Sequence, residues 1–100
     1  DQCEKAIDQA ASKLVPITVG TASRRLDGWC RNRRQRTGVT DETLTVTRLD
    51  SGEGKPVAVL VNFTAHPTFM TAEQMLFSGG WPGHMQRSLN RLIEGDPGVM

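Results

Sequence analysis

Two features of this chain have the residue types for chemistry: a histidine that follows an apolar run, His66, and a cluster of arginines at residues 24–36. His66 comes just after residues 57–63, the most apolar stretch, and the ends of strands are where α/β sheets present side chains to ligands. Neutral imidazole is a common zinc ligand, and the hydroxyls of Thr64 and Thr68 are placed to orient it. His66 is therefore a candidate metal ligand, and a histidine hydrogen-bonded to backbone is the simpler interpretation.

The arginine cluster has six arginines against one acid, Asp27. A guanidinium makes paired, charge-assisted hydrogen bonds to carboxylates, phosphates or polarised carbonyls, and residues 32–34 are the place for an arginine of that kind. Solvated arginines on a loop, or a basic patch for phosphate, nucleic acid or anionic lipid, are the alternatives. Nucleic acid is not expected, because the cluster contains one tryptophan and no series of aromatic residues for base stacking.

The elements that must position these residues follow from periodicity and turn chemistry. Apolar residues at helical spacing predict two amphipathic helices, and threonines alternating with Leu44 and Val46 predict a half-buried strand. The apolar run at 57–63 predicts a strand buried on both faces, and Gly95 with Pro97 predicts the end of the second helix. The predicted order is a helix at 4–14, a strand at 15–22, a long loop at 23–40, strands at 43–49 and 57–63 about a turn at 50–56, and a helix from 82 to 94.

The expected fold class is mixed α/β, with both helices packed on a partly antiparallel sheet of three or more strands. The 100 residues form one segment, with a hydrophobic share of 37% and a net charge of +1, so no global charge selects a partner. No apolar run is long enough for a transmembrane helix. Cys3 and Cys30 do not define a disulfide framework, and a strand left partly exposed would allow self-association.

Three segments, taken together and in order, resemble the neutral/alkaline (non-lysosomal) ceramidase family. Asn32-Arg33 resembles the family's Asn-Arg step, and residues 60–70 resemble its hydrophobic strand leading into a His-Pro-Thr-x-Met stretch. Residues 78–83 resemble its Ser-x-Asp-x-x-Gly step into a helix. The resemblance covers about residues 28–94 and corresponds to a segment of the N-terminal catalytic domain.

Members of that family are zinc hydrolases that cleave the amide bond of N-acylsphingosines. The resemblance implies that His66 is a zinc ligand, that Arg33 lies at the catalytic site, that a ceramide-like lipid is the substrate, and that the protein is secreted or part of the cell envelope. Gly80 stands where the family has an aspartate, and the chain has no tyrosine to match the family's tyrosine ligand.

The expected role is therefore that of a segment with an incomplete active site, whose remaining zinc ligands and main partner are the rest of the parent catalytic domain. The chain begins with Asp rather than Met, as expected of a processed or excised piece. Two alternatives remain open: a small α/β binding module that uses the arginine cluster, and a non-catalytic structural piece.

Overall fold

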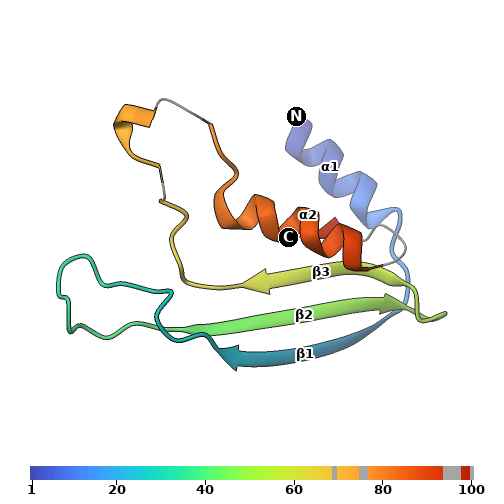
Figure 1. Cartoon of the computed structure of the whole chain (residues 1–100). Coiled ribbons are helices and arrows are strands. Elements are labelled where there is room, and N and C mark those ends of the chain that lie inside the picture. The colour runs from blue at the N-terminus through green and yellow to red at the C-terminus, as the bar shows by residue number, and fades with distance from the viewer. Residues whose placement is uncertain (69, 75–76, 94–97, 100) are drawn as a thin grey trace.

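A four-stranded sheet with strand order β1-β2-β3-β4 forms the centre of the computed structural model (Figure 1), which describes residues 1–68, 70–74, 77–93, 98 and 99. β1, β2 and β3 pair antiparallel, and β4 pairs parallel with β3. The expected mixed α/β class is confirmed, as is the order helix, strand, long loop, hairpin, helix. The elements are α1 (Gln2–Ala11), β1 (Ile17–Arg25), β2 (Thr43–Ser51), β3 (Pro56–Asn62), a 3-10 turn (Ala72–Gln74), α2 (Gly80–Leu92) and β4 (Gly98–Val99).

The register of β2 separates a polar face of the sheet from an apolar one, as the alternation predicts. Thr47 lies opposite Thr21, and their hydroxyls are 3.0 Å apart, while the next hydroxyl pair, Ser23 and Thr45, is 2.9 Å apart. Cross-strand hydroxyl pairs of this kind stabilise a sheet by up to about 1 kcal/mol each. The intervening side chains, among them that of Val46, point to the other face.

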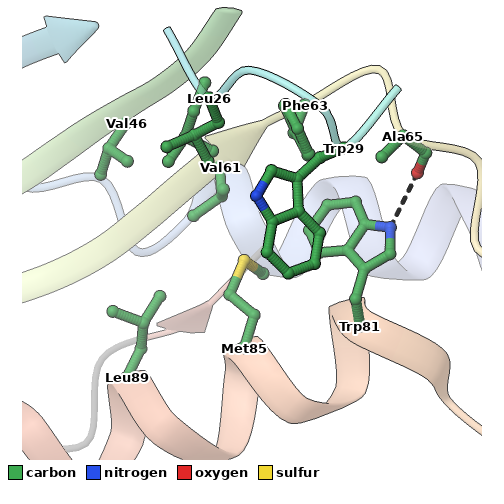
Figure 2. Close-up of a pocket in the computed structure, with 10 residues that line it drawn as sticks. Leu26, Trp29, Val46, Val61, Phe63, Ala65, Trp81, Met85 and Leu89 are labelled. Carbon is green, nitrogen blue, oxygen red and sulfur yellow. Dashed lines mark hydrogen bonds between the residues drawn. The ribbon is translucent and has the colours of Figure 1, made fainter. Parts of the chain in front are cut away.

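α2 lies along this apolar face, with Met85 and Leu89 toward the sheet as predicted (Figure 2). Its first turn is anchored by Trp81, whose Nε1 donates to the carbonyl of Ala65 at 2.7 Å. The Trp81 ring meets that of Phe63 edge to face, with 5.8 Å between centroids. Leu92 continues the helical spacing of Met85 and Leu89, but it is 78% exposed because no described residue covers the last turn of the helix.

The expectation that both helices pack on the sheet is wrong for α1, since every residue of that helix is exposed. A capping box at Asp1 begins the helix, and the Ser12 hydroxyl donates to the carbonyl of Gln9 at 2.9 Å where the helix ends, short of the predicted residue 14. The apolar side chain of Ile7 is 67% exposed. α1 therefore presents its apolar face without a partner in the described part of the chain.

β3 was expected to be buried on both faces, and this is also corrected by the structure. Among the described residues only Ala58 and Val59 are buried, at 8% and 2% exposure, while Val57 and Leu60 are each 40% exposed. Leu60 lies opposite Thr47 on the face that carries the threonines of β2 (the threonine face), which α2 does not cover, and Val57 lies at the register shift next to Leu49 and Asp50.

The bounds of the long loop and the strands also differ from the prediction. β1 continues to Arg25 because it pairs with β2 along its whole length, so the loop comprises residues 26–42 rather than 23–40. The short parallel strand β4 was not predicted, because two residues are too few for a periodic signal. The predicted helix end at Gly95 and Pro97 lies outside the described residues. No helix in the described ranges has the length and apolar content needed to cross a bilayer.

The scarcity of buried residues gives a first prediction for the 100-residue chain expressed alone. We expect it to bind the dye ANS and to lose its near-ultraviolet circular dichroism gradually on heating, because burial of apolar area is the main source of cooperative stability. A single sharp transition with no dye binding would contradict this expectation. The measurement is a thermal scan with both signals recorded on the same sample.

Candidate functional site

The antiparallel register brings the arginine region and His66 to the same end of the sheet. Arg25, the last residue of β1, lies opposite Thr43, the first residue of β2, and Asn62, the last residue of β3, lies opposite Thr45. The loop of residues 26–42, called the arginine loop from here on, and the connection after β3 therefore leave the sheet side by side (Figure 1). Residues far apart in the sequence meet there.

Thr64 ties the connection after β3 to the arginine loop. Its hydroxyl donates to the backbone carbonyl of Asp41 and lies 3.3 Å from the thiol sulfur of Cys30. Because the hydroxyl has one proton, which goes to the carbonyl, the Cys30 thiol is the donor in the second contact. The sequence analysis expected Thr64 to orient His66 through a hydrogen bond, whereas the structure shows it fixing the backbone two residues before the histidine.

Glu42 closes the neck of the arginine loop. Its carboxylate accepts from the Arg25 guanidinium at 3.0 Å and from the backbone N–H of Gly28 at 2.7 Å, and its side chain is only 9% exposed. Gly28 has a φ of 84°, a left-handed conformation that favours glycine, and this turns its N–H toward the carboxylate. Arg25 also pairs with Asp27, and this hydrogen bond holds the pKa of the Asp27 carboxyl below its ordinary value.

Asn32 organises the tip of the loop, which explains the chemistry of the Asn-Arg step. Its side-chain oxygen accepts from the backbone N–H groups of Arg34 and Gln35, at 3.0 and 3.2 Å, in a turn of the kind that asparagine favours. Gly38 packs against the same side chain, since a Cβ at that position would lie 2.6 Å from the Asn32 amide nitrogen. The backbone on both sides of Arg33 is thus held in a turn, while its side chain is exposed.

These ties create a cleft of about 670 Å³ between the arginine loop and the connection after β3. His66 and Arg33, the two predicted site residues, both line it, and both are exposed. Arg31, which the sequence analysis did not single out, lines the cleft too, whereas Arg34 is not among its lining residues. The other polar side chains that line the cleft are those of Cys30, Asn32, Thr40, Asp41, Thr64 and Thr68.

Among the residues that the structure describes, no three His, Cys, Asp or Glu side chains come together as a metal site. The cleft has three side chains of ligand type, but the Cys30 thiol is bonded to Thr64. The Asp41 carboxylate accepts from the Thr43 backbone N–H at 2.9 Å, and this bond lowers the pKa of Asp41. Of these three side chains, only that of His66 makes no hydrogen bond in the described part of the chain, so it remains the candidate metal ligand of the cleft. His84, on α2, is exposed and lies outside the cleft.

An apolar groove of about 350 Å³ lies between α2 and the sheet, next to the cleft (Figure 2). Trp29 and Ala65 line both spaces, so the groove opens into the cleft at these residues. Trp29 and Trp81 form the end of the groove nearest the cleft, where Trp29 is 70% exposed. The remaining lining residues are Leu26, Leu44, Val46, Val61, Phe63, Met85 and Leu89.

Comparison of the chain with protein-family models, with curated proteins and with solved structures finds no match in any of the three. The chemistry of the site therefore follows from its own residues. The cleft offers an imidazole, two guanidinium groups and several hydroxyls, and the groove offers a hydrocarbon surface. Such a pair of spaces suits a molecule with a polar group at one end and an apolar chain at the other.

The neck of the arginine loop provides the second prediction. Replacing Glu42→Ala leaves Arg25 and the Gly28 N–H without their acceptor, which costs about 1–3 kcal/mol of local stability. We expect trypsin to cut after the arginines of the loop about tenfold faster or more, because cleavage follows the population of the opened loop. The control is Glu53→Ala, which removes an ion pair with Lys55 whose side chains are 76% and 77% exposed. Equal cleavage rates in the two variants would contradict the role given to Glu42.

Proposed function

We propose that this chain is a segment of a zinc-dependent amidohydrolase that cleaves the amide bond of N-acylsphingosine-like lipids. The resemblance of residues 28–94 to neutral ceramidases motivates this proposal. The observation that carries it is the meeting of His66 and Arg33 in one cleft, although the two residues come from separate connections. The resemblance assigns both to the catalytic site of the family, and the fold of this chain places them at one end of its sheet.

The groove supports a lipid substrate. A lipid amide needs a polar place for the reacting bond and an apolar place for its hydrocarbon chain. The cleft and the groove offer these two surfaces next to each other, joined at Trp29 and Ala65. Both volumes lie in or close to the range of about 300–1,000 Å³ that is typical of small-molecule sites.

Each residue of the site has a definite task in this proposal. Zinc, when bound, polarises the amide carbonyl and lowers the pKa of a water molecule. His66 would be one of its ligands, and the guanidinium of Arg33 would hydrogen-bond an oxygen of the substrate that gains negative charge. A catalytic zinc site needs about three protein ligands, and this chain supplies one, so the others would come from the rest of the parent domain.

The open surfaces of the sheet support the view that the chain is part of a larger catalytic domain. The threonine face also carries the exposed apolar side chains of Val19 and Leu60, and the apolar side of α1 has no partner in the described residues. An extended sheet with more helices would cover these surfaces and would supply the missing ligands. A non-catalytic structural piece would show the same open surfaces, and the experiment below separates the two functions.

Zinc binding by the natural protein that contains this sequence is the test. We expect about one zinc per protein molecule, and the His66→Ala variant should lose zinc affinity by two orders of magnitude or more, together with amidase activity on an N-acylsphingosine. The measurement is metal content by mass spectrometry with competitive titration against a chelator.

His84→Ala is the matched control, since it removes the only other histidine, which is exposed on α2 outside the cleft. Zinc content and activity should stay at the level of the unmodified protein in this variant. Equal loss in both variants would point to general unfolding. Retention of zinc in His66→Ala would overturn the assignment, and absence of zinc from the unmodified protein would favour the non-catalytic alternative.

A further inference from the structure

We infer that the cleft binds an oxyanion group, a phosphate or a carboxylate, at the polar end of a single-chain amphiphile whose hydrocarbon part lies in the apolar groove. This goes beyond the proposed function, since an N-acylsphingosine is neutral and has two hydrocarbon chains. Binding of the amphiphile does not need zinc and is tested separately.

The charge of the cleft is the first reason. Arg31 and Arg33 form no ion pair in the described part of the chain, although both line the cleft. Residues 28–40 contain four arginines and no acidic residue. The only carboxylate on the cleft wall, Asp41, accepts from the backbone N–H of Thr43. Two guanidinium groups beside one carboxylate leave an excess of positive charge in the cleft, and an anionic ligand would balance it.

The hydrogen-bond donors of the cleft fit an oxyanion as well. A guanidinium presents paired N–H groups that match two oxygens of a carboxylate or phosphate. The amide nitrogen of Asn32 lies against Gly38, so the guanidinium groups of Arg31 and Arg33 are the main donors of the cleft. The hydroxyls of Thr40 and Thr68 line the same space. This set is rich in donors, as recognition of an anion requires.

The groove decides that the anion belongs to an amphiphile rather than to a small polar molecule. It is lined by apolar side chains from both sides, among them Val46 and Val61 of the sheet and Met85 of α2 (Figure 2). Trp29 forms part of both walls, and its ring faces the groove in Figure 2. A hydrocarbon chain in the groove would therefore continue directly into a headgroup in the cleft.

The arginine loop is held in place before any ligand arrives, which favours affinity. Glu42 fixes its neck, Thr64 joins it to the connection after β3, and Asn32 shapes its tip. A binding site whose loops are already ordered loses less conformational entropy when the ligand binds. Nucleic acid fits less well, because the loop has a single aromatic ring, that of Trp29, and no series of rings for base stacking.

The test is calorimetric titration of the natural protein that contains this chain, in EDTA, with dodecyl phosphate below its micelle concentration. Two further ligands separate the sources of affinity: inorganic phosphate has the anion without the chain, and dodecyl maltoside has the chain without the anion. We expect dodecyl phosphate to bind at least tenfold more tightly than either. Raising the salt concentration should lower the affinity for dodecyl phosphate and leave the affinity for dodecyl maltoside unchanged.

The double variant Arg31→Gln with Arg33→Gln should lower the affinity for dodecyl phosphate by about tenfold or more, because each charge-assisted hydrogen bond that is lost contributes about 1.5–3 kcal/mol. The control is Arg91→Gln on α2, outside the cleft and the groove, which should bind as the unmodified protein does. Circular dichroism of all variants checks that each is folded. A second variant tests the groove. Val46→Trp would fill it, and should lower the affinity for dodecyl phosphate while leaving the affinity for inorganic phosphate unchanged.

Equal affinity for dodecyl phosphate and dodecyl maltoside, or full affinity in the double variant, would overturn the inference, and so would absence of binding. Failure of the proposed function gives a different result. Arginine-dependent binding of dodecyl phosphate without amidase activity on any N-acyl lipid would remove the hydrolase and leave the binding site. Activity on neutral N-acylsphingosine with no binding of dodecyl phosphate would support the hydrolase and remove the binding site for an anionic amphiphile.

Discussion

The antiparallel register of β1, β2 and β3 is the constraint on which the rest of the structure depends. It places the end of β1, the start of β2 and the end of β3 at one edge, so that two long connections leave the sheet together. A slip by one residue would turn the threonines of β2 to the other face and move Thr64 away from the carbonyl of Asp41. The hydroxyl pairs between β1 and β2 favour the observed register over a one-residue slip, which would place Thr21 and Ser23 opposite residues without a hydroxyl.

The two faces of the sheet differ in what covers them. The apolar face supports α2 through Met85 and Leu89, and the space left between helix and sheet is the groove. The threonine face is open, and only two described residues of the chain are buried. A domain of this size normally buries a larger core, so the described residues bury little apolar area for their number.

The cleft combines an ordered backbone with charge that is not neutralised. The Glu42 carboxylate pairs with Arg25 at the neck of the loop, whereas the guanidinium groups of Arg31 and Arg33 line the cleft. The same separation appears at Thr64, whose hydroxyl fixes the backbone while His66 stays accessible. Residues that shape the site and residues that face a ligand are thus distinct, which allows each group to be tested by substitution without disturbing the other.

The sequence by itself determined the elements: alternating threonines specified β2, helical spacing placed Met85 and Leu89 on one face of α2, and turn residues closed the hairpin. It also placed His66 directly after a strand. These features depend on neighbours along the chain, which a sequence displays. Only the tertiary structure brought His66 to Arg31 and Arg33, made a groove of Trp29 and α2, and left α1 and one side of β3 uncovered. Strand pairing and helix packing decide those features, and they depend on contacts between distant residues that local periodicity does not encode.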